Sequence, residues 1–214
     1  MSEKDNKIQY SQKEELANVL THGVGIILSL IGIILLILKA LRYGDHWHLV
    51  GFIVFGISLL IMFSSSTMYH YVHGGNTRKK LRKLDHSAIY ILIAGTYTPF
   101  LLTNLRGTTG WIMFAVIWIF GIVGIVVKLA TQIKSKWVSA AIYLAMGWLA
   151  VFIAKPLIQN LPTISIVYLA CGGLFYTLGV IFYTWKNLPY HHAIWHIFVL
   201  GGSICHFLSM YYIL

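Results

Sequence analysis

The stretch HGVGIILSLIGIILLILKAL, residues 22–41, decides the fold class, because its 20 residues include a single charged side chain, Lys39. A helix that crosses a lipid bilayer needs about 20 mostly apolar residues. Six further stretches are similarly apolar and of similar length: 47–69, 87–105, 111–129, 137–154, 164–183 and 192–214. Membrane β-strands are shorter and alternate in polarity. We therefore predict an all-α integral membrane protein, a bundle of seven transmembrane helices.

The composition of the whole chain supports this class. Hydrophobic residues make up 58% of the 214 positions and charged residues only 10%, whereas soluble domains are about 45–50% apolar and about 25% charged. A soluble enzyme, a secreted disulfide scaffold and a disordered chain are thereby excluded. We expect a polar cytoplasmic segment at 1–21, without a cleavable signal peptide, and a single membrane domain at 22–214.

Basic residues are distributed unequally between the two sides of the predicted bundle. Twelve Lys and Arg residues fall on the side of the N-terminal segment, and four fall on the other side. Basic loops mark the cytoplasmic side of a membrane protein. We predict a cytoplasmic N-terminus and an external C-terminus. The net charge of +10 therefore does not indicate nucleic-acid binding, because no basic stripe lies on a soluble face.

Three histidines are predicted to meet at the cytoplasmic side. His192 and His196 are four residues apart at the start of the last span, so both rings project from one helix face, and His70 ends the second span at the same depth. Three imidazoles with an open fourth position are typical of catalytic zinc sites. The alternative interpretation is that His192 and His196 are interfacial side chains that bond to lipid headgroups.

Two oxygen-bearing side chains are predicted to accompany this zinc site. Asp85 is the only acidic residue after Asp45 and stands where the third span begins. It would accept a proton from a water molecule, although it could instead be an interfacial carboxylate paired with Arg82 or Lys83. Ser66 precedes His70 by one helical turn and would orient a ligand or substrate.

Other polar residues near the membrane receive structural interpretations. Glu15, Asn18 and His22 share one helix face ahead of the first span, and a local hydrogen bond there is favoured slightly over a direct role. His206 lies ten residues beyond His196, about 15 Å along a helix, too far to share the metal. We expect His206 to face the bundle and to bond to a neighbour.

These residues carry a resemblance to a known family. The matching pieces are Glu15-Leu-Ala-Asn18-Val-Leu-Thr-His22, Ser66-Thr-Met-Tyr-His70, Asp85, His192-Ala-Ile-Trp-His196 and His206. In this set the chain resembles the bacterial hemolysin III family, within the progestin and adipoQ receptor superfamily of seven-helix membrane proteins. The resemblance implies a multi-pass protein of the bacterial plasma membrane. It also implies a zinc ion on His70, His192 and His196, with Asp85 reaching it through water.

Three functions follow as hypotheses. The first is a zinc-dependent hydrolase of lipid amide bonds, since the superfamily is distantly related to alkaline ceramidases, with a membrane lipid as substrate or ligand. The second is a non-enzymatic regulator of membrane fluidity or energetics with a structural zinc. The third is a haemolytic protein, as the family name suggests, although no amphipathic segment is present that could move from water into lipid.

Overall fold

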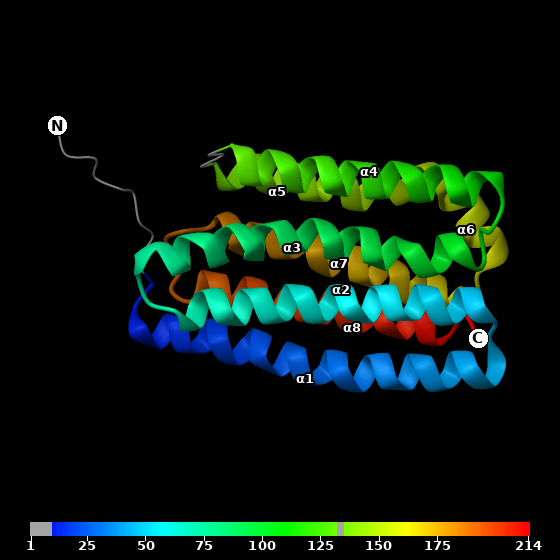
Figure 1. Ribbon diagram of the computed structural model, residues 1–214, viewed down its shortest axis with the longest axis horizontal. Coiled ribbons are helices and arrows are strands. Elements are labelled where there is room, and N and C mark those ends of the chain that lie inside the picture. Colours follow the sequence, from blue (N-terminus) through cyan, green and yellow to red (C-terminus); the bar gives the residue numbers. More distant parts are fainter. Residues whose placement is uncertain (1–9, 132–134) are drawn as a thin grey trace.

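The computed structural model describes residues 10–131 and 135–214. Its elements are helical throughout these ranges: α1 (Gln12–Tyr43), α2 (His46–Tyr71), α3 (Gly75–Leu102), α4 (Thr108–Ala130), α5 (Lys136–Gly147), the 3₁₀ helix η1 (Trp148–Ile153), α6 (Ala154–Asn160), α7 (Thr163–Thr184) and α8 (His191–Tyr211). Figure 1 shows the long helices side by side along the long axis of the molecule. No strand occurs in the described part of the chain.

Six helical segments are long and apolar enough to cross a membrane: α1, α2, α4, α7, α8 and the combined segment Lys136–Asn160. The prediction of an all-helical, multi-pass membrane protein is therefore confirmed. α3 falls outside this set because basic residues fill its first turns and polar residues interrupt its centre.

Two of the expected boundaries are wrong. α3 begins at Gly75, twelve residues before the expected span, so the predicted connection up to residue 86 is mostly helical and Asp85 lies inside the helix rather than at its start. The reason is that the first turns of α3 are polar and basic. They lengthen the helix but add nothing to the apolar stretch from which the boundary was predicted. The expected span 137–154 is a broken element in which α5, η1 and α6 follow one another to Asn160.

Side-chain caps fix where the first two long helices begin. Ser11 and Glu14 form a reciprocal capping box at the start of α1. Asp45 caps α2 by accepting hydrogen bonds from the backbone N–H groups of Trp47 and His48, each at 3.0 Å. These contacts satisfy donors that have no partner within the helix, so the short α1–α2 connection forms a defined corner.

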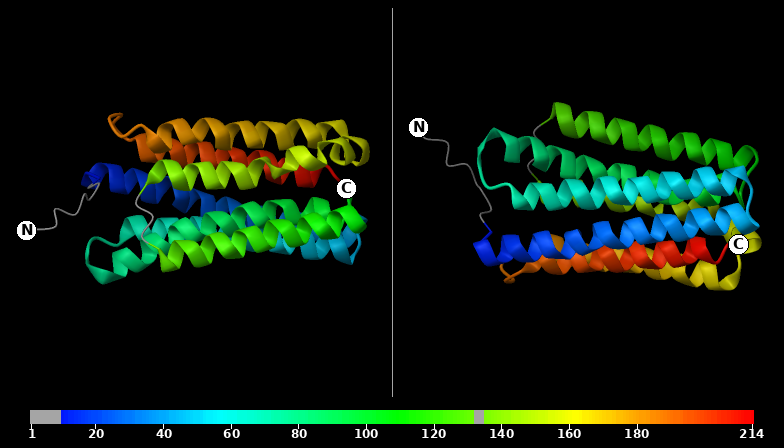
Figure 2. Two further views of the ribbon diagram at one scale, coloured as in Figure 1. Left: turned by 90° about the horizontal axis from the view of Figure 1, so that it is seen from above. Right: turned by 60° about the horizontal axis from the view of Figure 1, so that its bottom comes forward.

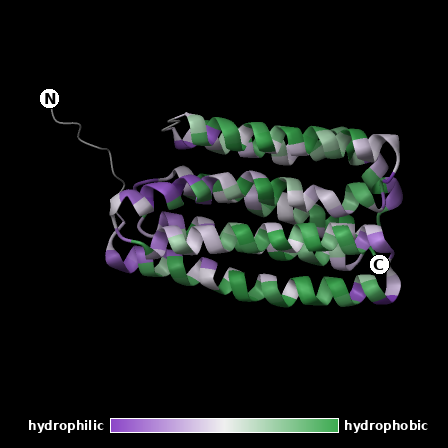
Figure 3. Cartoon of the chain, in the orientation of Figure 1, coloured by the Kyte–Doolittle hydropathy of each residue, from purple (hydrophilic) through white to green (hydrophobic). Residues whose placement is uncertain are grey.

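The helices place polar residues at the two ends and apolar residues along the flanks. The basic end is defined here as the end where α1, α3, α5 and α8 begin, and α8 finishes at the opposite end (Figures 1 and 2). Hydrophilic residues gather at the basic end, whereas the middle of the helices is mostly hydrophobic (Figure 3). Outward-facing side chains such as Leu30, Ile119 and Leu178 are about half exposed, as expected of surfaces that face lipid.

A cavity of about 470 Å³ lies among α3, α5, η1, α6, α7 and α8. Its lining is mostly apolar and includes a few polar side chains, among them His22, Asp85, Tyr143, Tyr176 and His206. Tyr97 of α3 bonds to the backbone where α5 ends and η1 begins, which forms one wall of this cavity. Its hydroxyl donates to the carbonyl of Gly147 at 2.5 Å and accepts from the N–H of Ala150 at 2.7 Å.

Candidate metal centre

Three histidines from two helices converge near the basic end. His70 lies in the last turn of α2, and His192 and His196 lie in the first turns of α8. One ring nitrogen of each lies within 4.8 Å of the others, and the Nε2 atoms of His70 and His192 are 3.2 Å apart. All three rings are buried. The structure thus brings together the three residues that the sequence predicts as metal ligands.

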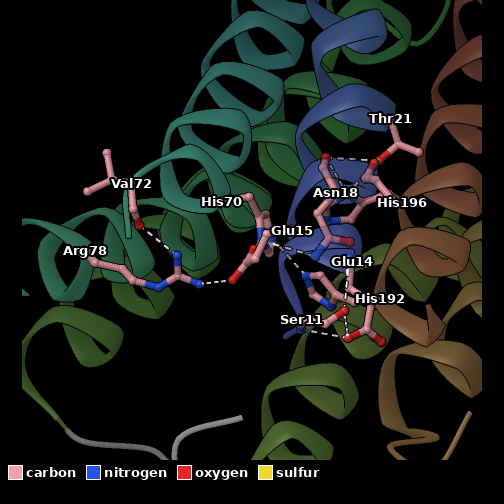
Figure 4. Close-up of polar contacts among 11 residues, drawn as sticks. Ser11, Glu14, Glu15, Asn18, Thr21, His70, Val72, Arg78, His192 and His196 are labelled. Carbon is pink, nitrogen blue, oxygen red and sulfur yellow. Dashed lines mark hydrogen bonds and ion pairs between the residues drawn. The ribbon is translucent and has the colours of Figure 1, made fainter. Parts of the chain in front are cut away.

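Helix α1 orients the ring of His70. The Nδ1 atom of His70 donates to Oε2 of Glu15 at 2.7 Å, and the other carboxylate oxygen of Glu15 accepts from Arg78. Figure 4 shows this chain of contacts from Arg78 through Glu15 to His70. A proton on Nδ1 leaves the Nε2 lone pair of His70 available, and that atom faces His192.

Helix α1 orients His196 in the same way. The Nδ1 atom of His196 lies 3.3 Å from the carbonyl oxygen of Asn18 and 3.1 Å from the hydroxyl of Thr21. Donation from Nδ1 leaves the lone pair on Nε2 of His196, and this buried atom has no hydrogen-bond partner in the described part of the chain. A metal ion would satisfy such a lone pair, so the donor set fits a cation that prefers neutral imidazole.

The interpretation of Glu15, Asn18 and His22 as a local hydrogen-bonded group is wrong. Glu15 contacts a residue 55 positions away, and the amide Nδ2 of Asn18 lies 3.3 Å from Nδ1 of the same ring, His70. The ring of His22 stacks on that of His196, with centroids 3.5 Å apart and an interplanar angle of 11°. The spacing of these three residues on one helix face could have predicted this arrangement. Side chains on the same face of α1 approach the same neighbouring helices.

Asp85 and Ser66 lie near this cluster but outside the three-histidine group. Asp85 is buried in α3, lines the cavity, and has its Oδ2 3.5 Å from Nδ1 of His86. Ser66 is buried one turn before His70, and its hydroxyl has no hydrogen-bond partner in the described ranges. His22 lines the same cavity as Asp85 and stacks on His196. The cavity therefore extends to the edge of the histidine cluster.

His206 and His191 bond to backbone carbonyl groups outside the cluster. The Nε2 atom of His206 lies 3.3 Å from the carbonyl oxygen of Leu169 on α7, which confirms the expectation of a bundle-facing histidine with a neighbouring partner. His191 instead directs its Nδ1 to the carbonyl of Phe182, at 2.9 Å.

Comparisons with known proteins identify the family. The model of the family described as "Haemolysin-III related" matches residues 10–207. The chain belongs to the haemolysin III family. It is 46% identical over 198 residues to the hemolysin-3 homolog of Bacillus subtilis (strain 168), covering 92% of this chain and 93% of that protein. It is 44% identical over 215 residues to hemolysin-3 of Bacillus cereus, covering 100% and 98% of the two chains.

A more distant relative extends this relationship beyond bacteria. The monocyte to macrophage differentiation factor of Homo sapiens is 30% identical over 204 residues, covering 92% of this chain and 83% of that protein. This similarity supports membership of the progestin and adipoQ receptor superfamily.

Sequence reasoning missed one further contact in this haemolysin III protein. Tyr10 precedes α1, and its ring stacks on that of His192, with centroids 5.1 Å apart. Burial raises the pKa of Tyr10, with a smaller contribution from Tyr69, so the phenol remains neutral beside the imidazoles. No sequence motif identifies Tyr10, because it lies in a polar segment. Its contact with the cluster depends on how the start of α1 is oriented, which the sequence does not reveal.

Proposed function

We propose that this protein binds zinc through His70, His192 and His196 and hydrolyses an amide bond in a membrane lipid. The observation that carries the proposal is the combination of three buried imidazoles within 4.8 Å and an adjoining apolar cavity of about 470 Å³. A zinc ion would supply Lewis acidity toward a carbonyl oxygen and would make a water molecule nucleophilic at neutral pH.

The protein's own residues would position the substrate and move the proton. The apolar lining of the cavity accommodates an acyl chain, since burial of each CH₂ group contributes roughly 0.8 kcal/mol. Asp85 is the carboxylate that lines this cavity, and its Oδ atoms would accept the proton of the attacking water and return it to the leaving nitrogen. The unpartnered hydroxyl of Ser66 would donate a hydrogen bond to the substrate or to Asp85.

We propose that α3 is a seventh span, because it runs alongside the other helices (Figure 1). The basic end would face the cytoplasm, since nine of the thirteen Lys and Arg residues in the described ranges lie there. The membrane would then be the bacterial plasma membrane, with the histidine cluster near its inner face.

The first test measures metal content and then lipid turnover. Detergent-purified wild type is expected to hold about one zinc per chain by mass spectrometry, and the His192→Ala/His196→Ala variant to hold little. Asp85→Asn should retain zinc but lose release of fatty acid from a panel of lipid amides, by about 100-fold or more. Absence of metal from both proteins would contradict the metal site, and unchanged turnover in Asp85→Asn would contradict the role of the carboxylate.

A structural zinc is the second candidate, and one observation favours it. The histidine cluster joins α2 to α8, and Glu15 and Asn18 join both to α1. A zinc ion there would hold three helix ends together in a regulator of membrane properties. Chelation would then lower the thermal unfolding temperature, and the purified wild type would turn over no lipid amide.

A further inference from the structure

The basic end contains an ammonium group that is withdrawn from water and has no carboxylate partner among the described residues. Lys136 begins α5, and its Nζ is inaccessible to water and has no hydrogen-bond partner among the described residues. The ring of Tyr183 lies 5.0 Å from this Nζ, a cation–π contact. Because an ammonium group withdrawn from water is unfavourable unless it is paired, an anion would be stabilised beside Lys136.

Further basic residues lie in this region of the basic end and come from other elements of the fold. Lys128, in the last turn of α4, is partly buried and donates to the hydroxyl of Ser139 at 3.1 Å. Arg82 of α3 and the exposed Lys186 add positive charge around Lys136. In the described ranges, none of the cations Arg82, Lys128, Lys136 and Lys186 has a carboxylate oxygen within 4.0 Å.

The cations lie just beyond one end of the cavity. Arg82 precedes Asp85 by three residues on α3, and Ser139 precedes Tyr143 by four residues on α5. Both Asp85 and Tyr143 line the cavity, so along their helices Arg82 is about one turn, or about 5 Å, and Lys136 about two turns, or about 10 Å, from its lining.

Aromatic residues place this group at the level of lipid headgroups. Trp137 directly follows Lys136 and is 67% exposed, and Trp185 directly precedes Lys186 and is 52% exposed. Exposed tryptophans at helix ends are typical of the membrane–water interface.

We propose that Arg82, Lys128 and Lys136 form a binding site for a phosphate group, and that its occupant is the headgroup phosphate of an anionic phospholipid. Lysine binds phosphate as a point charge and arginine as a planar fork, so all three residues suit phosphate oxygens. The neighbouring cavity and the exposed tryptophans favour a lipid over a free ion. This binding site does not require the hydrolysis proposed above, since it concerns affinity alone.

The test compares buried with exposed basic residues at the same end of the full-length protein. Delipidated protein in detergent is titrated with phosphatidylglycerol or phosphatidylcholine, and bound lipid is counted by native mass spectrometry. Lys128→Gln/Lys136→Gln is expected to weaken phosphatidylglycerol binding roughly 30-fold. The control Lys79→Gln/Lys80→Gln removes the same charge from two exposed positions and should change affinity less than about twofold. Lys128→Arg/Lys136→Arg should retain binding.

Competition with inorganic phosphate distinguishes a lipid headgroup from a free phosphate ion as the ligand. Phosphatidylglycerol binding that millimolar phosphate does not displace supports the lipid headgroup, whereas displacement supports a phosphate site that a free ion also fills. Equal loss in both glutamine pairs, or equal binding of phosphatidylglycerol and phosphatidylcholine by wild type, would overturn the proposal. Zinc content measured on the same samples is expected to be unchanged, which separates this result from failure of the metal centre.

Discussion

The molecule contains the same carboxylate–imidazole contact in two different settings. Near the basic end, Glu15 of α1 and His70 of α2 are joined at 2.7 Å, and their side chains are 6% and 0% exposed. At the opposite end, Asp45 and His48 are also joined at 2.7 Å, but their side chains are 44% and 18% exposed. The first pair links two helices across 55 positions, whereas the second lies within the first turn of one helix.

The difference shows that burial, and not contact distance, determines the energetic role of such a pair. Removing one member of a buried pair leaves the other without water or a partner, which costs about 3–5 kcal/mol. An exposed pair is screened by water and contributes about 0–1 kcal/mol. The buried pair can therefore fix the orientation of a ligand residue, while the exposed pair only helps to begin α2.

Removal of the buried carboxylate is expected to have the largest effect. Glu15→Ala leaves Nδ1 of His70 without its carboxylate acceptor and Arg78 without its ion-pair partner, and we expect it to lower the free energy of unfolding by about 3–5 kcal/mol. Denaturant unfolding in detergent micelles would measure this loss. A loss under about 1 kcal/mol would show that the buried pair is no more important than the exposed one.

A change at Glu15 that keeps the size of the side chain tests its role in orienting the His70 ring, rather than the cost of leaving buried groups without a partner. Glu15→Gln retains an acceptor for His70 Nδ1 but removes the negative charge that favours the required tautomer. Replacing a residue that orients a metal ligand in this way typically weakens metal binding about 10–100-fold. Competition with a zinc chelator would measure the affinity, and Asp45→Asn, which lies at the other end, should leave it unchanged.

A smaller effect is expected from the exposed pair. Asp45→Ala removes the cap of α2 and should destabilise the protein by about 1 kcal/mol, whereas Asp45→Asn should keep most of the cap because Asn is also a favourable cap residue. Thermal unfolding of the two variants would measure the difference. Equal destabilisation by both would show that charge, rather than capping, stabilises this corner.

The smallest expected effect is a loss of folding stability at low pH. Partial burial acts to raise the pKa of Asp45, but hydrogen bonds from the backbone and side chain of His48 outweigh it and lower the pKa to about 2. Because the folded-state pKa lies below the unfolded value of about 3.9, this stabilisation is present above about pH 4 and is lost as the pH falls toward 2. We expect wild type to lose under about 1 kcal/mol more than Asp45→Asn over that range, measured as the difference between their unfolding temperatures. An identical acid response in the two proteins would contradict this linkage.

The sequence predicts the apolar helices and the histidine cluster for different reasons. Long apolar runs indicate spans by composition alone, and the spacing of His192 and His196 together with the position of His70 places three rings at one depth. The contribution of α1 could not be predicted in this way, because Glu15 and Asn18 lie in a polar segment whose contacts depend on the packing of α1 against α2 and α8. The early start of α3 was hidden by its basic residues, which form a helix without a hydropathy signal.

The break between α5 and α6 affects the mobility of the cavity wall. In a regular helix each backbone amide is held by the preceding turn, but at this break the N–H of Ala150 depends on the hydroxyl of Tyr97 instead. Side chains therefore help to hold the segment where η1 joins two shorter helices: Tyr97 bonds to its backbone, and Nε1 of Trp148 donates to the hydroxyl of Thr177 at 3.2 Å. Hinges form where a few residues at the ends of elements absorb the change in backbone angles. We therefore expect the segment around η1, rather than the regular helices on either side of it, to be where this wall of the cavity bends.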